Sequence, residues 1–183
     1  MKFSKTLLLS LLVALLAGCG TAIQSAVSDA PLDRQARWAV LPMANNTDTP
    51  QAGLSAEAMI EHQIRALGVV NLRRYPAALS RDSLFEPTER KVTEEALAWA
   101  KTQGVRYAVM GSVEEWRYKV GIDGEPAVGV SLQVLDVSTE RVVWSASGAQ
   151  SGWSRQSLAA VAQATLTKLL SSLEFATAAT AAK

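Results

Sequence analysis

The stretch VRYAVMGSVEEWRYKVGIDGEPAVGVSLQVLDVSTERVVWSASGAQ, residues 105–150, sets the architecture of this chain. It holds three runs in which apolar side chains alternate with polar or small ones, and this period of two is typical of strands. Turn signals separate the runs at Asp123-Gly124, a hairpin dipeptide, and at Ser138-Thr139. The pattern predicts an antiparallel meander whose first hairpin protrudes, with strands over 105–121, 128–134 and 141–149.

The first of these strands changes its alternation at Glu114-Glu115. Before this pair the bulky residues occupy odd positions, such as Val109 and Val113, and after it even positions, such as Trp116. Such a change of parity predicts a β-bulge at the two glutamates. Because neighbours in a regular strand point to opposite faces, the two carboxylates are not expected to converge.

Two further strands and two helices precede the meander, and a helix follows it. Residues 50–67 have apolar side chains at the spacing of one helix face, and Gly68 follows as a stop signal. We expect strands at 37–43 and 69–75, irregular chain at 77–87, and helices at 50–67, 93–103 and 154–173. The predicted fold class is a single α/β domain over residues 37–174, a mixed β-sheet flanked by about three helices, with a flexible tail at 175–183.

The N-terminal segment is basic, then apolar, and ends at the single cysteine. The apolar run 7–17 is shorter than the roughly 20 residues that span a bilayer, which is typical of a secretory signal peptide. The tetrapeptide LAGC at 16–19 resembles the bacterial lipobox. That resemblance implies a signal peptide at 1–18, and an N-acyl chain with an S-diacylglycerol group on Cys19. A plain signal peptide that happens to contain a cysteine is the alternative.

Gly20 follows the cysteine, whereas in Gram-negative lipoproteins an aspartate there usually means retention at the inner membrane. The resemblance therefore implies the periplasmic face of the outer membrane. Residues 19–36 are small and polar without periodicity, so we predict a lipidated tether. At ~3.5 Å per residue this tether reaches at most ~60 Å, which keeps the domain close to the membrane.

Composition and motifs exclude several classes of function. Removal of residues 1–18 lowers the formal net charge from +1 to −1, which argues against a nucleic-acid partner. The chain has no P-loop, GxGxxG, HExxH or GxSxG motif. His62, the only histidine, is expected on the solvated face of its helix and cannot alone build a usual zinc site. We therefore predict no catalytic residue, no metal site and no enzymatic activity.

The predicted hairpin tip carries two acidic side chains, Asp123 and Glu125. In a monomer they are simply a turn residue and a solvated carboxylate. In a closed ring the same tip would repeat once per subunit, and repeated carboxylates around an aperture would concentrate cations. The tip is therefore a candidate acidic lining only if the chain oligomerises.

Trp153, in the segment SGWSR at 151–155, allows two interpretations. With Ser154 as helix N-cap, the indole would pack on Leu158 as a hydrophobic staple. Alternatively, an exposed indole on a loop of small residues would seek a membrane interface, with Arg155 at the lipid head groups.

Three segments resemble the PelC family of outer-membrane lipoproteins, which serve Pel exopolysaccharide secretion. They are ARWAVLPMANNTDTPQAG (36–53), ALAWAKTQGVRYAVMGSVEEWRYKVGIDGEPAVGV (96–130) and VVWSASGAQSGWSRQSLAAVAQ (142–163). The resemblance covers the chain from Ala36 to about Leu173. The wider fold group includes CsgG, LpoB and the N-terminal domain of TolB.

The resemblance implies a homo-oligomeric ring of about twelve subunits beneath a PelB-like β-barrel exporter in the outer membrane. An acidic funnel would guide a cationic exopolysaccharide, rich in partly deacetylated amino sugars, to the pore. Cys19 would be the anchor, Trp153 and Arg155 would face the membrane, and Asp123 and Glu125 would line the funnel.

Two other functions within the fold group remain open. A CsgG-like secretion channel needs membrane-spanning hairpins, and only the 112–134 hairpin is long enough. An LpoB-like activator of penicillin-binding proteins must reach the inner membrane, for which residues 19–36 are too short. A structural lipoprotein without a transport role is the remaining alternative.

Overall fold

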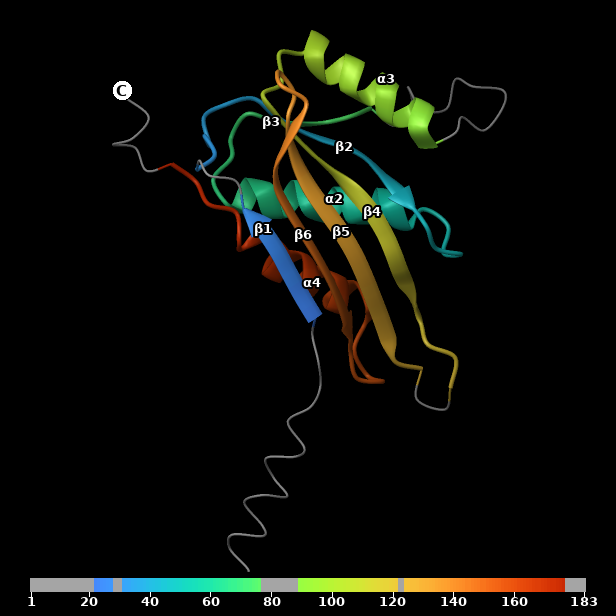
Figure 1. Ribbon diagram of the computed structural model, residues 1–183. Helices are drawn as coiled ribbons and strands as arrows, with labels where there is room; N and C mark the ends of the chain where they lie inside the picture. Colours follow the sequence, from blue (N-terminus) through green and yellow to red (C-terminus); the bar gives the residue numbers. More distant parts are fainter. Residues whose placement is uncertain (1–21, 28–30, 77–88, 122–123, 177–183) are drawn as a thin grey trace, which may run out of the picture.

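The computed structural model describes residues 22–27, 31–76, 89–121 and 124–176. The predicted signal peptide, Cys19, Asp123 and the chain at 77–87 that was expected to be irregular lie outside these residues. Within the described part, six strands form one sheet in the order β1-β6-β5-β4-β2-β3 (Figure 1). The strands are β1 (Ala22–Val27), β2 (Trp38–Asn45), β3 (Leu72–Arg74), β4 (Tyr107–Tyr118), β5 (Pro126–Asp136) and β6 (Arg141–Ser151). The helices are α2 (Ala52–Ala66), α3 (Glu89–Thr102) and α4 (Leu158–Leu170).

The sheet is mixed, as predicted. β2 pairs in parallel with β3 and β4, and β4, β5 and β6 form the expected antiparallel meander. The single α/β domain and the order of its elements from β2 onward are therefore confirmed.

The bulge in β4 is confirmed and corrects one expectation. The register against β5 shifts between Val113 and Glu115, and Val113 and Trp116 are both buried. The two glutamates between them therefore line the same groove instead of pointing to opposite faces. The expectation that the two carboxylates point to opposite faces assumed a regular strand, and the bulge interrupts that alternation.

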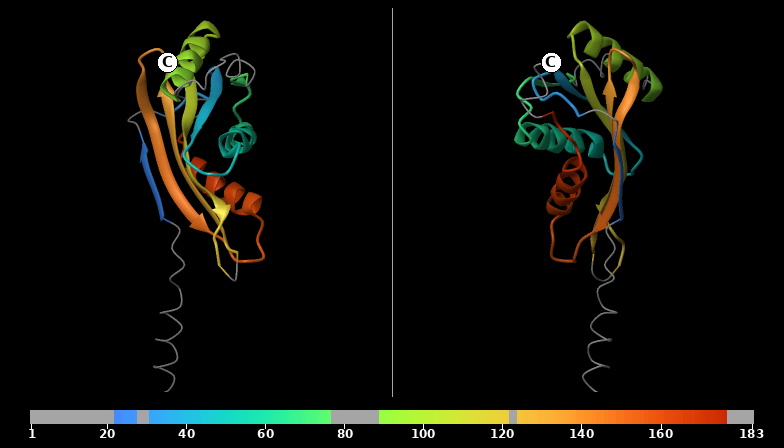
Figure 2. Two further views of the ribbon diagram at one scale, coloured as in Figure 1. Left: turned by 90° about the vertical axis from the view of Figure 1, so that its right-hand side faces the viewer. Right: turned by 60° about the vertical axis from the view of Figure 1, so that its left-hand side comes forward.

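Helices cover the two faces of the sheet unequally. Figure 2 shows α2 and α4 on one face, whereas α3 crosses the other face at one end only. The larger core lies under α2 and α4, where residues such as Ile60, Val109 and Leu166 are completely buried. A smaller core lies under α3 around Ala100 and Leu135. The rest of this second face carries no helix of the described chain.

The predicted start of the last helix is wrong by four residues. α4 begins at Leu158, and its N-cap is Ser157, whose side chain accepts a hydrogen bond from the Ala160 N–H at 3.2 Å. Residues before it form a closed turn, because the Gln156 side chain accepts from the Trp153 N–H at 2.8 Å and the Gln156 N–H donates to the Trp153 carbonyl. Both serines are good N-caps by type, so only this turn decides between them.

The predicted tether is wrong for most of its described length. Ala22–Val27 forms β1, which pairs antiparallel with the edge of β6. Farther along, Leu32 is buried, and the carbonyl of Asp33 accepts a hydrogen bond from the Trp38 indole N–H at 2.9 Å. An edge strand is stabilised by backbone pairing with a neighbour, so a weak side-chain pattern did not reveal it.

The tail is also held at its start. Phe175 bridges to Leu32, and its ring lies 5.9 Å from the ring of Trp38. The Ala176 N–H donates to the Leu32 carbonyl at 2.8 Å. The expected flexible tail therefore does not begin at 175, and residues 177–183 lie outside the described residues.

No helix among the described residues has the length and apolar character needed to cross a membrane.

Candidate functional site at the hairpin end

One end of the sheet gathers most of the candidate residues. We call it the hairpin end, comprising Ala22, 118–121, 124–126 and 151–157. Strand register places these segments together, because Ala22 lies opposite Ala149 in β6, and β5 begins at Pro126 opposite Tyr118. Figure 1 shows the β4–β5 hairpin, the start of β1 and the β6–α4 loop at the same lower end.

The opposite end of the sheet is the turn end, comprising 33–38, 70–71, 104–107, the β5–β6 turn at 136–141 and Phe175, whose ring lies 5.9 Å from that of Trp38. β2, β3 and β4 all begin there, and Tyr107 pairs with Asp136. At ~3.3 Å per residue along β4, the two ends lie roughly 35 Å apart.

Trp153 is exposed at the hairpin end. Its side chain is 71% exposed, and Arg155 beside it is exposed as well. The hydrophobic staple with Leu158 is therefore excluded, because the helix starts later than the staple requires. Of the two interpretations of Trp153, only the exposed indole remains.

Glycine at 152 lets the Trp153 loop pack closely on the hairpin. A Cβ at this position would lie 2.5 Å from Val161 Cγ2 and 3.0 Å from Pro126 Cγ, so a larger residue would push the loop away. The Gly152 N–H donates to the Pro126 carbonyl at 2.8 Å. The loop is thus fixed to β5 as well as to β6.

The acidic tip belongs to the same end. Gly124 has a φ of +52°, a conformation that suits glycine in a tight turn. Glu125 is partly exposed, and its carbonyl accepts a hydrogen bond from the Lys119 N–H at 2.7 Å. The structure thus places Glu125 and Trp153 at one end, whereas Asp123 lies outside the described residues.

A polar groove lies on the sheet face that α2 and α4 leave open. Its main part has a volume of about 580 Å³. Small and amide side chains line it, among them Gln24, Ser112, Ser131, Gln133 and Ser147. Glycine is needed at position 111 at the base of the groove, because a Cβ there would lie 1.9 Å from the Ser131 carbonyl oxygen.

Glu114 lines a neighbouring part of this groove, closer to the hairpin end, together with Gly129 and Ala149. Its carboxylate accepts hydrogen bonds from the Ser112 hydroxyl and, at 3.0 Å, from the Asn46 side-chain amide, and these bonds lower its pKa. Its neighbour Glu115 pairs with Arg117 at 3.1 Å, whereas Glu114 has no cationic partner among the described residues. Sequence reasoning missed this residue, and the only signal that pointed to it was the change of parity in β4.

The described residues offer no site for a metal. No group of three or more His, Cys, Asp or Glu side chains comes together in this part of the chain. His62 is exposed on α2, as expected.

Among the comparisons with known proteins, only the one with solved structures finds matches to this chain. No protein-family model matches the chain, and no curated protein matches it. Among solved structures, the PelC dodecamer from Paraburkholderia phytofirmans shares 40% sequence identity, and the match covers 86% of this chain and all of that one, with a TM-score of 0.73. A variant of the same protein gives 39% identity, the same coverage and a TM-score of 0.74.

A more distant structure shares only the fold. The lipoprotein GNA1162 from Neisseria meningitidis is 14% identical, with a TM-score of 0.54 over 74% of this chain and 96% of that one. The identity and full coverage of the Paraburkholderia structures are far higher. They show that this chain belongs to the PelC family.

Proposed function

We propose that this chain is a lipid-anchored outer-membrane protein that assembles into a ring and guides a cationic exopolysaccharide to a β-barrel exporter. The observation that carries the proposal is the 40% identity to a PelC dodecamer along that protein's whole length. In this mechanism no bond is made or broken, and the ring supplies a charged passage and a docking platform.

The position of β1 supports the membrane orientation. Only Gly20 and Thr21 lie between Cys19 and the start of β1 at Ala22, and the three residue steps from Cys19 to Ala22 span at most about 11 Å when extended. With an acylated Cys19, the hairpin end would therefore lie at the bilayer surface, with exposed Trp153 and Arg155 toward it. Such a short connection does not suit an LpoB-like activator, which must reach the inner membrane.

The acidic tip would then lie on the membrane side of the ring. Glu125, with Asp123 beside it in the sequence, would be repeated in every subunit close to the outer membrane. Repeated negative charges concentrate cations at low dielectric boundaries, and weak binding at each site lets a polymer slide. Export should therefore weaken as salt rises, because exposed charges are screened beyond ~8–10 Å at physiological ionic strength.

The first experiment measures the assembly. The chain from Gly20 onward retains every described residue, and its mass is measured by native mass spectrometry and light scattering. A discrete closed assembly of about twelve subunits is expected. If both this chain and the lipidated protein in bilayers are monomers, the ring and its funnel are refuted.

The second experiment tests whether export depends on the two carboxylates of the hairpin tip or only on the total negative charge of the protein. Asp123→Asn with Glu125→Gln should reduce the amount of secreted polymer while the assembly mass stays constant. The matched control is Glu95→Gln with Glu140→Gln, which removes two surface carboxylates from outside the hairpin end. Equal export by the tip variant and the control would remove Asp123 and Glu125 from the proposal.

A further inference from the structure

Val120 is an exposed apolar residue at the hairpin end. It follows β4 by two positions and is fully exposed. A single exposed apolar side chain needs no explanation. Val120, however, shares its end of the sheet with Trp153, which is 71% exposed, and with the half-exposed Tyr118.

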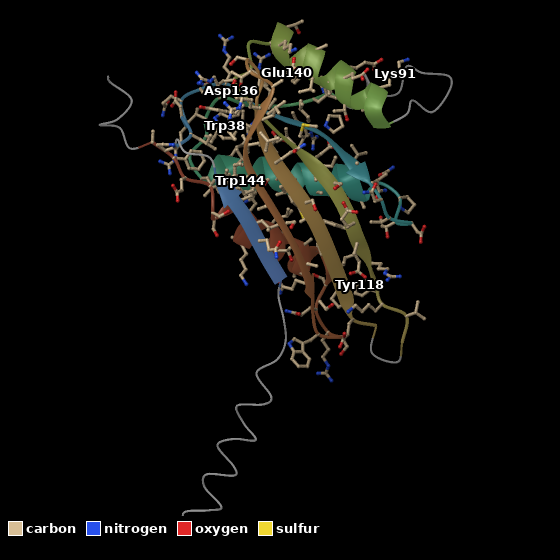
Figure 3. The ribbon with its side chains drawn as sticks, in the orientation of Figure 1. Trp38, Lys91, Tyr118, Asp136, Glu140 and Trp144 are labelled. Atoms are coloured by element: carbon tan, nitrogen blue, oxygen red, sulfur yellow. The ribbon has the colours of Figure 1, made fainter. Side chains whose placement is uncertain are left out.

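Hydrogen bonds hold Val120 and Trp153 in one unit. The Tyr118 hydroxyl accepts from the Leu158 N–H at 2.9 Å, which connects β4 to the start of α4. The Lys119 ammonium donates to the Ser151 hydroxyl at 2.6 Å, which connects the hairpin to the end of β6. Figure 3 shows Tyr118 near the base of the hairpin, at the end away from Asp136. The residues flanking Val120 and Trp153 are therefore tied to the same framework.

The charges around these side chains suit a lipid interface. Lys119 precedes Val120, and Arg155 lies two residues after Trp153 on an exposed loop. Apolar and aromatic side chains flanked by cations settle at the boundary between head groups and acyl chains. Among the described residues of this end the opposing charge is Glu125, which is half-buried and whose carbonyl accepts a hydrogen bond from the Lys119 N–H. Asp123, two residues earlier in the sequence, is a second acidic residue of the tip.

We propose that Val120 enters the head-group boundary of the bilayer at the same end of the sheet as Trp153, so that each subunit meets the membrane at the lipid anchor, the indole and the hairpin tip. This inference rests on the lipid anchoring proposed above. The start of β1, opposite Ala149 and three residues from Cys19, supplies the direction in which the bilayer lies. The hairpin tip thereby becomes a membrane contact as well as an acidic rim.

The depth of Val120 can be measured on the lipidated protein. Cys19 is the only cysteine, so acylation leaves a Val120→Cys variant with one free thiol for an environment-sensitive fluorophore. The protein is reconstituted in vesicles of phosphatidylethanolamine and phosphatidylglycerol with nitroxides at shallow or deep positions. The matched control is Val70→Cys at the turn end, where the native side chain is 71% exposed.

The expected result is a blue-shifted emission for the label at 120 and quenching by shallow nitroxides about twofold or more above that of the label at 70. Quenching of both labels by aqueous iodide to the same extent would overturn the inference. Protection from iodide without quenching by lipid nitroxides would also overturn it, because the tip would then be covered by a second subunit. The quenching experiment measures the depth of the label on each subunit, whatever the oligomeric state. A monomer whose hairpin tip inserts would therefore refute only the ring. A ring whose hairpin tips stay in water would refute only this inference.

Discussion

The two ends of the sheet differ in whether their large aromatic side chains are buried or exposed. At the turn end, the ring of Trp38 lies 4.8 Å from that of Tyr107, and the guanidinium of Arg34 lies 4.3 Å above the ring of Phe175. At the hairpin end, Trp153 and Val120 are exposed. The aromatic rings of the turn end are covered by contacts within the chain, although Val70 there is exposed, whereas at the hairpin end the tryptophan itself is exposed. The difference predicts that the tryptophan of the turn end contributes to the stability of the fold and that Trp153 does not.

Replacing one tryptophan at each end should give the largest contrast. Trp38→Ala removes a completely buried indole and should lower the free energy of unfolding by about 3–5 kcal/mol. Trp153→Ala should change it by less than about 0.5 kcal/mol, because the side chain is 71% exposed. Denaturant unfolding at one protein concentration measures both. A large loss for Trp153→Ala would show that the indole is a structural residue after all.

The same comparison can be made with one carboxylate at each end of the sheet, Asp136 and Glu125. Asp136 is 7% exposed and accepts hydrogen bonds from the amides of Ser138 at 3.0 Å and Thr139 at 3.3 Å. Asp136→Asn should cost about 1–3 kcal/mol at neutral pH, because it weakens this charged acceptor site. Glu125→Gln is the control at the hairpin end and should leave the fold unchanged, as measured by the same unfolding experiment.

The cost of Asp136→Asn should depend on pH. Burial works to raise the pKa of Asp136, but the Ser138 hydroxyl and amide, Arg106 and the Thr139 amide together lower it. A lowered pKa in the folded state stabilises the protein above the ordinary aspartate pKa, about 3.9, and this stabilisation is lost as the pH falls through the lowered pKa. The difference between wild type and variant should shrink below about pH 4. A constant difference between pH 7 and pH 2 would contradict this account.

The start of α4 tests whether local structure also stabilises the hairpin end. Ser157→Ala should cost about 1 kcal/mol, because it removes the side-chain acceptor for the Ala160 N–H. Ser154→Ala, three residues earlier, should have almost no effect on thermal unfolding. If Ser154→Ala were the more destabilising of the two substitutions, Ser154 would be the N-cap, and Trp153 could then pack on Leu158 as a hydrophobic staple.

The smallest effect is expected between the ends, at Glu57 in α2. This side chain is 4% exposed and accepts from the Met43 N–H at 3.0 Å. Burial raises its pKa, although the Met43 amide and Arg74 oppose the shift. A raised pKa in the folded state means that stability falls as the pH rises through the interval between the ordinary and the raised value. Glu57→Gln lacks this penalty, so its stability relative to wild type should rise slightly from pH 4 to pH 7; a relative loss over that range would contradict it.

Periodic patterns predicted most of the fold. The alternation over 128–134 and the helix spacing over 50–67 correspond to β5 and α2, and the change of parity in β4 located the bulge. These elements were predictable because each buries a regular face against the core. β1 was missed because it is an edge strand held by backbone pairing with β6.

The candidate site was predicted only in part. Sequence singled out Trp153 and Glu125 by residue type, but it could not place them at one end of the sheet or decide between the two interpretations of the indole. Glu114 was missed because its setting depends on the bulge and on Asn46 from the loop after β2. Both cases depend on residues far apart in the chain.

The sequence by itself determined the α/β class, the meander, the resemblance to the PelC family and the candidate anchor at Cys19, because these follow from local periodicity and short motifs. Only the tertiary structure decided that β1 enters the sheet beside β6, that α4 starts after Ser157, and that Val120 and Trp153 lie at one end. Those features arise from pairing and packing between distant segments, and no local pattern encodes the relative position of such segments.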